Sequence, residues 1–411
     1  MSILSKNRDF RLIFSASAIS NLGDGVSALA FPWLATLITR DPALIALVAF
    51  ATRLPWLLFS IPAGVITDRF DRRTLMIQAD MFRFLLTAGV IALILNIDSF
   101  PPEHGEILYI ALLSSIAFLL GSAEVIRDNA AQTVLPSIVK PDQLERANGQ
   151  LWSIEEIMGS FVGPPLAGFL IAWAIPAPFA LDAITFALAA WIVWSMTLPK
   201  RDKPVRRSAW VEAKEGAVWM KGHPIILQLA IMLGILNGLH MATLTVLVLF
   251  SQEILGLSAA GHGLLLTAGA AGGVIGGILC PAVAKRLGNR PSLLVAMFLM
   301  AVSSLLTAVT GSVWIVALSL FIGMLAGLLW NVVTVSYRQR VIPDALLGRV
   351  NSIYRFFGWG MMPIGALLGG WLVAWTEPEL GRETALRLVF YVSAMGTFAM
   401  FGYGAARLRL S

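Results

Sequence analysis

Long apolar stretches separated by short polar segments make up most of the chain. A helix that crosses a membrane needs roughly 20 mainly apolar residues. Twelve stretches reach that length, and both ends of the chain are therefore expected on the same side of a membrane. The predicted spans are Phe10–Ile38, Ala43–Ile66, Leu75–Ile97, Ile107–Ile126, Gly149–Ala174, Phe179–Thr197, Pro224–Phe250, Gly261–Ala284, Ser292–Thr310, Val313–Tyr337, Asn351–Trp375 and Ala385–Arg407.

The composition agrees with a membrane protein. The 411 residues are 57% hydrophobic and 13% charged, whereas soluble domains carry about 25% charged residues. The net charge of +6 does not indicate a nucleic-acid partner, because the basic residues lie beside apolar spans, where they determine topology. The lone cysteine, Cys280, excludes an intrachain disulfide.

The basic residues also predict the orientation. Most of the 30 Lys and Arg precede the first span, follow an even-numbered span or lie in the central polar segment. The opposite side holds only Arg40, Arg382 and Arg387. Positively charged loops stay in the cytoplasm, so we expect a multi-pass protein of the cell membrane with both termini cytoplasmic. The first apolar segment is too long for a signal peptide and is interpreted as a retained span.

The longest polar segment, Pro199–His223, follows the sixth span. It predicts an N-terminal six-helix bundle (1–198), a cytoplasmic linker (199–223) and a C-terminal six-helix bundle (224–411). Its basic first part is either a solvated tether or a membrane-surface segment. Its second part, Trp210–Met220, is predicted to be an amphipathic helix on the membrane surface.

The two halves repeat short patterns at corresponding positions. Gln132-x3-Pro136 and then Asn148 follow the fourth span, and Gln339-x3-Pro343 and then Asn351 follow the tenth. Each copy precedes a span interrupted by glycine and proline. Internal repeats of this kind are typical of secondary transporters.

Ionisable residues inside spans are costly and therefore mark candidate functional sites. Asp24 and Arg53 both lie about 20 Å from the cytoplasmic helix ends, at a rise of about 1.5 Å per residue. This matched depth predicts an ion pair. In one interpretation Asp24 binds a coupling proton and Arg53 adjusts its proton affinity; in the other the pair only holds two helices together. Gly23 and Gly25 beside the acid allow a close approach of substrate or of another helix.

Further acids extend this set of candidates. Glu124 and Arg127 are three residues apart and share a helix face. Glu155 and Glu156 point about 100° apart, so only one is expected to face a cavity. The proton-coupling candidates are Asp24, Arg53, Glu124 and Glu156.

Two interpretations in this group assign no transport role. Asp80 and Arg83, also three residues apart, are interpreted as a self-satisfied pair. Asp182, near the outer end of its helix, is expected to snorkel toward the membrane surface.

A short charged loop, Gly64-Val-Ile-Thr-Asp68-Arg69-Phe-Asp71-Arg72-Arg73, separates the second and third spans. The pattern G-x-x-x-D-R-x-x-R-R resembles the corresponding loop of the major facilitator superfamily, except that Asp71 stands where that family usually has glycine. By this resemblance Asp68, Arg69 and Arg73 are gating residues. Gly64 permits close packing of helix ends, and Arg127 is a candidate partner of the Asp68 carboxylate.

The fifth span carries Gly159-x3-Gly163-Pro164-x2-Ala167-Gly168. It resembles the antiporter motif of proton-driven drug exporters, with Gln150 and Ala167 in place of the usual glycines. The resemblance implies a role in coupling for Gly159, Gly163, Pro164 and Gly168. The alternative is generic packing, because small residues four apart let helices approach closely.

Arg8-Asp-Phe-Arg11, Asn21-x-Gly-Asp24 and the Arg127…Gln132…Asn148 stretch resemble the macrolide-efflux and enterobactin-exporter branch of the same superfamily. The resemblance implies an all-α major facilitator fold with two pseudo-symmetric six-helix bundles. It also implies drug:proton antiport by a monomer, with a lipophilic or amphipathic substrate bound near the membrane midplane. The expected partners are that substrate, protons and the lipid bilayer, without a cofactor or metal.

Four alternatives remain open at this stage. A proton-coupled importer, a siderophore exporter and a lysophospholipid transporter would share the fold. A membrane enzyme is disfavoured, because the sequence has no metal-ligand cluster, nucleophile elbow or phosphate loop.

Overall fold

The computed structural model describes residues 3–140, 143–197 and 209–409, and these residues form helices and short connections without a β-strand. Twelve helical stretches within the described residues are long and apolar enough to cross a membrane. The predicted all-α membrane architecture with twelve spans is thereby confirmed.

The chain divides into two compact units. The first comprises Met1–Arg40, Ala51–Arg206 and Ser258–Leu264; the second comprises Asp41–Phe50, Arg207–Leu257 and Leu265–Ser411. The first eight helices and one π-helical segment are α1 (Ile3–Lys6), α2 (Arg8–Ile38), α3 (Pro42–Arg69), α4 (Arg72–Leu95), α5 (Glu106–Ile138), α6 (Leu144–Glu156), η2 (Ile157–Val162), α7 (Gly163–Trp173) and α8 (Ala177–Trp194). The remaining helices are α9 (Ala209–Lys221), α10 (Pro224–Glu253), α11 (Ala259–Leu287), α12 (Asn289–Val309), α13 (Val313–Val341), α14 (Asp344–Leu380) and α15 (Arg382–Arg407).

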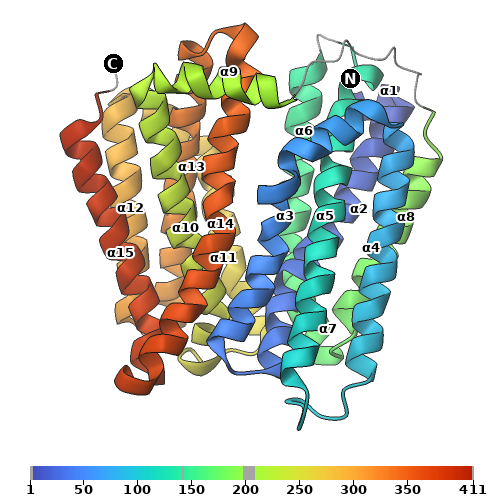
Figure 1. The fold of residues 1–411 in the computed structure, drawn as a ribbon, viewed down its shortest axis with the longest axis vertical. Coiled ribbons are helices and arrows are strands. Elements are labelled where there is room, and N and C mark those ends of the chain that lie inside the picture. The colour runs from blue at the N-terminus through green and yellow to red at the C-terminus, as the bar shows by residue number, and fades with distance from the viewer. Residues whose placement is uncertain (1–2, 141–142, 198–208, 410–411) are drawn as a thin grey trace. The chain divides into compact units, whose positions relative to one another are not determined.

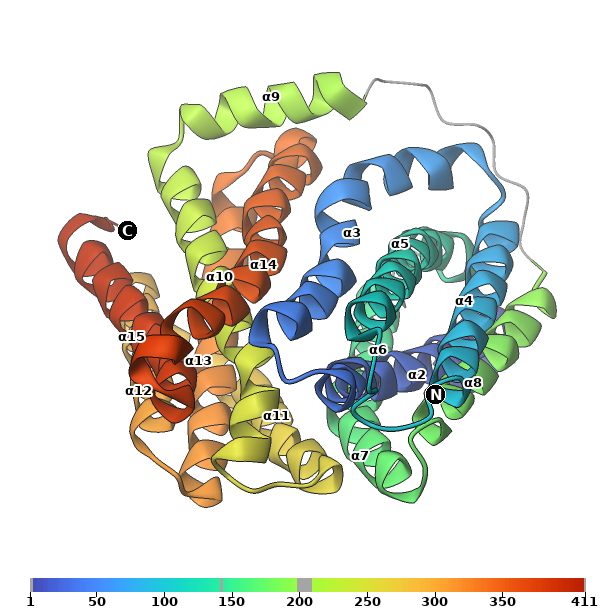
Figure 2. The ribbon, with the colours of Figure 1, turned by 60° about the horizontal axis from the view of Figure 1, so that its bottom comes forward.

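Helix α2 is the central element of the first unit. It packs against α5, α6, η2, α7 and α8, while α4 packs against α5 and α8. Figure 2 shows α2 among α6, α7 and α8. The N-terminal part of the helix buries Phe10 and Ile13 completely in an apolar cluster. Any polar side chain in the middle of α2 is thus held between several other helices.

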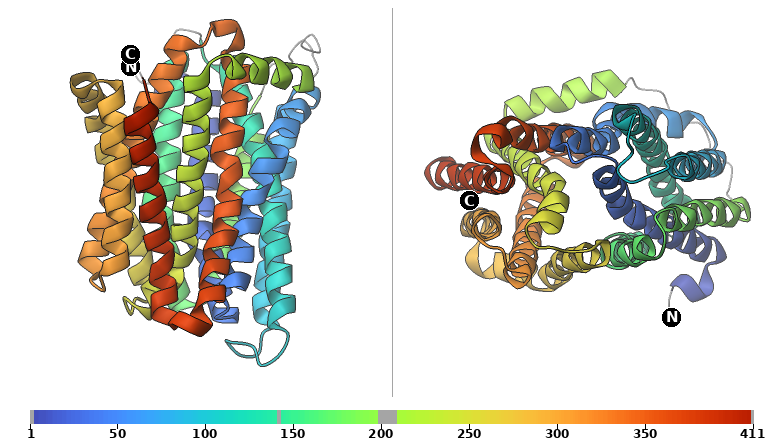
Figure 3. Two further views of the ribbon diagram at one scale, coloured as in Figure 1. Left: turned by 60° about the vertical axis from the view of Figure 1, so that its left-hand side comes forward. Right: turned by 90° about the horizontal axis from the view of Figure 1, so that it is seen from below.

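In the second unit α10 packs along α14, and α12 packs against α13 and α15. Trp330 and Tyr354 are buried in its apolar core. The long helices of each unit run alongside one another (Figure 3). The predicted helix in the central segment is present as α9, which packs against α14 and α10 and crosses their ends in Figure 1. The predicted basic tether lies largely outside the described residues.

Large apolar side chains on the outside of the units suit a lipid environment. Trp173, Trp314 and Trp375, near the ends of α7, α13 and α14, are each more than 80% exposed. Tryptophan is enriched where a membrane meets water. These side chains therefore fit the edges of an apolar belt.

Helix α5 extends further than its hydropathy indicates. The fourth span was expected to end at Ile126, but α5 continues to Ile138 with Pro136 inside it. Arg127, one residue beyond the predicted end of the span, is a buried residue of this helix. Charged residues lowered the local hydropathy without ending the helix, because partners on α4 and on α5 itself compensate their charge.

Candidate functional site

Asp24 in the middle of α2 forms an ion pair with Arg83 of α4. The predicted pairing of Asp24 with Arg53 is therefore wrong. The Arg83 side chain is 2% exposed and the Asp24 side chain 25% exposed, so the acid is the member of the pair that solvent reaches. Arg83 also donates to Ser20 Oγ at 3.3 Å and lies 3.9 Å from the centre of the Phe186 ring. The arginine is thus held in place around the acid.

The network continues from Arg83 through buried groups toward α5. Asp80 Oδ1 lies 3.7 Å from Arg83 Nη1 and 3.6 Å from Arg127 Nε. Arg127 Nη1 lies 3.5 Å from Asp128 Oδ1. The predicted pairing of Asp80 and Arg83 is present, but it is one link of a longer chain. Neither oxygen of Asp80 accepts a hydrogen bond among the described residues.

Two further charged groups face this network. Glu124, on α5, lies within electrostatic reach of Asp24, Arg83 and Arg53. Arg53, on α3, is half-buried and is the more distant of the two arginines that act on Glu124.

The two glutamates of α6 separate as predicted. The Glu155 side chain is half-buried and lies within reach of Asp128 and Arg127. The Glu156 side chain is exposed. The geometry therefore favours Glu155 over Glu156 as a member of the network.

Close backbone packing holds α2 against the motif of the fifth span. A Cβ atom built on Gly25 would lie 2.2 Å from Gly159 O, and one built on Gly163 would lie 2.6 Å from Gly25 Cα. On the neighbouring face of α2, a Cβ atom on Gly23 would lie 2.3 Å from Asp182 Oδ1. Only glycine admits these neighbours. The two glycines beside Asp24 therefore allow neighbouring helices to pack closely against α2.

The motif itself is not a regular α-helix. Residues Ile157–Val162 form a π-helical segment, and the Gly163 N–H donates to Met158 O, five residues earlier. Pro164 and Pro165 follow and have no N–H to donate. A π-helical turn inserted in a helix frequently marks a functional site. Gly168 packs near Ala259, with its built Cβ 2.4 Å from the Ala259 carbonyl oxygen.

The charged loop after α3 is tied to its own unit. Asp71 caps α4 by accepting from Thr74 N and Thr74 Oγ1, both at 2.8 Å, which explains an acid where the family usually has glycine. Arg73 donates to the carbonyls of Val193 and Trp194 at the end of α8.

Two expectations about this loop have no contact to support them. The close packing predicted at Gly64 is absent among the described atoms, since a Cβ there would have no neighbour within 4 Å. The Asp68 side chain lies outside the described residues, and the partners of Arg127 are Asp80 and Asp128. Gating by the loop stays a prediction.

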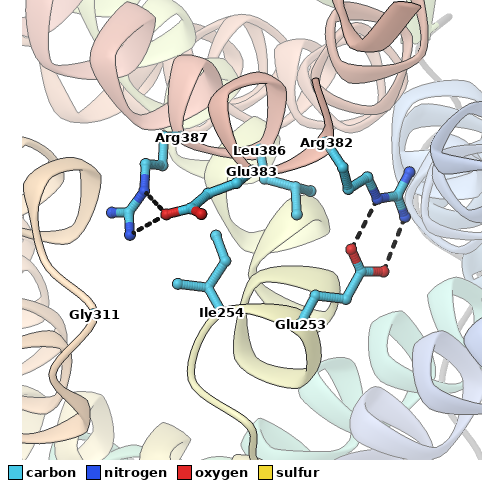
Figure 4. Close-up of a pocket in the computed structure, with 7 residues that line it drawn as sticks. All are labelled: Glu253, Ile254, Gly311, Arg382, Glu383, Leu386 and Arg387. Carbon is cyan, nitrogen blue, oxygen red and sulfur yellow. Dashed lines mark hydrogen bonds and ion pairs between the residues drawn. The ribbon is translucent and has the colours of Figure 1, made fainter. Parts of the chain in front are cut away.

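The second unit has a polar hollow of about 520 Å³ where α10, α14 and α15 end or begin. Figure 4 shows its two ion pairs, Arg382 with Glu253 and Arg387 with Glu383. Arg382 also pairs with Glu377 at 2.7 Å. Because each of these charged side chains has a partner of opposite charge, the hollow is interpreted as a structural tie between helix ends.

Three residues of the first unit escaped the sequence analysis or were misjudged in it. Asp128 was missed because the helix was expected to end before it. Ser27 carried no charge to attract notice, although it lies one helical turn after Asp24. Asp182 was expected to snorkel, but it is 1% exposed and accepts a hydrogen bond from Ser27 Oγ at 2.5 Å.

Twelve spans in two helical units, with an acid-rich buried network in one of them, define a transporter of the major facilitator fold. Solved structures support the fold. A bacterial homologue of the iron transporter ferroportin in an inward-facing state superimposes with a TM-score of 0.76 at 17% identity, covering 99% of this chain and 100% of that one. A D-xylose-proton symporter gives a TM-score of 0.69 at 13% identity, covering 95% of this chain and 97% of that one.

The chain belongs to the transmembrane secretion effector family of this superfamily, whose sequence model matches residues 4–400. The multidrug efflux pump Tap of Mycobacterium tuberculosis is 26% identical over 409 residues, covering 95% of this chain and 92% of that protein. Macrolide efflux protein A of Streptococcus pyogenes is 22% identical, covering 87% and 88%. The staphyloferrin A transporter of Staphylococcus aureus is 24% identical, also covering 87% and 88%.

Proposed function

We propose that the protein is a proton-coupled exporter of lipophilic or amphipathic small molecules that works by alternating access. Full-length similarity to a multidrug efflux pump and a macrolide efflux protein supports the substrate class and the direction. The antiporter-like motif of η2 and α7 supports exchange against protons.

The observation that carries the proposal is the excess of acid in the buried network. Six carboxyl groups share three guanidinium groups: Asp24, Asp80, Glu124, Asp128, Glu155 and Asp182 against Arg53, Arg83 and Arg127. Asp80 and Asp182 are buried, and the other four are partly exposed. A buried charge without a counter-charge is strongly unfavourable. In this proposal some of these carboxyls bind protons, and changes in their surroundings change how many.

Asp24 is the member of this network to which we assign the exchanged proton. Its side chain is 25% exposed and pairs directly with Arg83, whereas Asp80 is closed off and Asp128, 32% exposed, pairs with Arg127 instead. Protonation of Asp24 would neutralise its carboxylate and weaken the ion pair. Arg83 would then interact mainly with its other acidic neighbours. In this proposal binding of a proton to Asp24 and binding of the substrate alternate during the transport cycle.

Everted vesicles from an efflux-deficient host test the proposal. We expect uptake of a macrolide to require an imposed pH gradient and to be lost in Asp24→Asn at equal expression. The control is Asp98→Asn, in an exposed connection outside the network. Uptake at the same rate with and without the pH gradient would contradict proton coupling. Transport only into right-side-out vesicles would indicate an importer.

A siderophore exporter is the second candidate, favoured by the similarity to the staphyloferrin A transporter. The same vesicles distinguish the two substrates. Uptake of a siderophore in preference to the macrolide would move the assignment to this candidate. Uptake of a labelled lysophospholipid alone would exclude both.

A further inference from the structure

Asp182 of α8 is a buried carboxyl group that the transport proposal counts in the network without giving it a specific role. Its side chain is 1% exposed. Oδ2 accepts a hydrogen bond from Ser27 Oγ at 2.5 Å, whereas Oδ1 accepts none within the hydrogen-bond distance limit among the described residues. An ionised carboxylate offers about four acceptor sites. The hydroxyls of Ser27 and of nearby Thr87 leave most of these sites without a donor, whereas a protonated acid needs fewer.

The packing around Asp182 is specific to this acid. Its Oδ1 occupies space that any side chain at position 23 would need, together with Thr185 Oγ1. Gly23 and Ser27 are four residues apart and thus lie on one face of α2. This face contacts Asp182 at two points: Gly23 leaves space for its carboxyl group, and Ser27 donates a hydrogen bond to it. The position of the carboxyl is therefore set by α2, the helix that also carries Asp24.

The ionisable groups around Asp182 are few. Asp24 on α2 and Arg83 on α4 lie within electrostatic reach, and the hydroxyl of Thr87 on α4 lies nearby. Helix α7, which also packs on α8, has no ionisable side chain. Arg83 is therefore the nearby cation, and it already pairs with Asp24 and Asp80.

We propose that Asp182 is a second proton-binding site, linked to Asp24 through the shared Arg83. While Asp24 is ionised it holds Arg83, and Asp182 keeps its proton. When a proton binds Asp24 and an O–H bond forms there, Arg83 is released to compensate Asp182. The O–H bond of Asp182 can then break: its proton passes to a water molecule that reaches the carboxyl group, and Arg83 stabilises the carboxylate that remains. This inference rests on the proposed proton coupling and adds a relay to it.

Infrared difference spectra of the purified protein, recorded across a pH titration with and without a macrolide, test the relay. We expect two carbonyl bands from protonated carboxyl groups that change in opposite directions. One should be absent in Asp24→Asn and the other in Asp182→Asn. Ser27→Ala should shift the frequency of the Asp182 band, because it removes the hydrogen bond to that carboxyl. Asp98→Asn should match the wild-type protein.

Transport provides the second measurement. Asp182→Asn should lower gradient-driven efflux by about tenfold, within the range of coupling between two linked sites. It should also raise net substrate-induced proton release, because Asp182 no longer takes up a proton when Asp24 loses one. Asp182→Glu, which keeps a proton-binding group, should move both part of the way back to the wild-type values. If wild-type uptake in everted vesicles does not need the pH gradient, proton coupling itself fails. If it does, while Asp182→Asn keeps the wild-type proton count, pH profile and infrared bands, only the relay is wrong. Should Asp182→Asn not fold, an unshifted spectrum in Ser27→Ala would overturn the relay.

Discussion

Replacement of Gly163 by alanine should separate the motif of the fifth span from α2. The new Cβ would lie 2.6 Å from Gly25 C and Cα and 2.9 Å from Val26 N. These are backbone atoms in the middle of a buried helix and cannot rotate away, so one helix must move. Overpacking of this kind costs about 1–3 kcal/mol, which exceeds the gain of roughly 0.5–1 kcal/mol that alanine usually gives over glycine within a helix.

Two other glycines provide matched controls. A Cβ on Gly149, in α6, would have no neighbour within 4 Å, so Gly149→Ala should be stabilising by about 0.5–1 kcal/mol. A Cβ on Gly159 would lie 3.6 Å from Asn21 O, an ordinary contact, so Gly159→Ala should be tolerated although it belongs to the motif. Gly25→Ala, by contrast, should resemble Gly163→Ala.

The measurements are the thermal unfolding midpoint in detergent and drug susceptibility of an efflux-deficient host at equal expression. Gly163→Ala and Gly25→Ala should lower both the midpoint and resistance, whereas Gly149→Ala and Gly159→Ala should keep them. Equal effects at positions 159 and 163 would refute the packing argument. They would indicate that the motif acts through its sequence pattern as a whole.

Three further predictions concern charge. Asp24→Asn should abolish gradient-driven efflux but preserve substrate binding, measured by equilibrium binding; loss of both would contradict a role limited to the proton. Asp71→Ala should cost about 1 kcal/mol of stability through the lost helix cap, and an unchanged thermal midpoint would argue against that cap. Arg127→Met should cost about 3–5 kcal/mol because it leaves buried Asp80 without one of its cations; added Asp80→Asn should recover part of this, and no recovery would contradict the pairing.

The twelve spans could be predicted because hydropathy over some 20 residues reports burial in lipid regardless of which helices meet. The helix ends were harder. α5 continues through Arg127 and Asp128 to Ile138, and charged residues in a sequence look like a loop until their partners are known. The π-helical turn before Gly163 has no comparable signal in hydropathy, although the two prolines after it indicate an irregular backbone.

The partner of Asp24 shows a second limit of sequence reasoning. Depth along a helix follows from counting residues, and by depth Arg53 matches Asp24. Rotation about the helix axis and the choice of neighbouring helix do not follow from depth, and the structure places Arg83 beside the acid instead. A single sequence does not show whether the side chain of Asp24 on α2 points toward α4 or toward α3. The candidate acid could therefore be identified from the sequence, but its counter-charge could not.

Glycine positions connect the packing of α2 to its chemistry. Because Gly23 has no side chain, Asp182 can approach α2 closely on one side. Gly25 allows the motif of the fifth span to approach on another side. The two residues beside Asp24 therefore hold α2 in position. A carboxyl fixed in this way can respond to a proton only by changing its contacts with Arg83 or by moving α2 with its neighbours. Because α2 packs on α6, η2, α7 and α8, any movement of α2 is shared with the antiporter-like motif. Coupling between the acid and the motif would then follow from backbone contact.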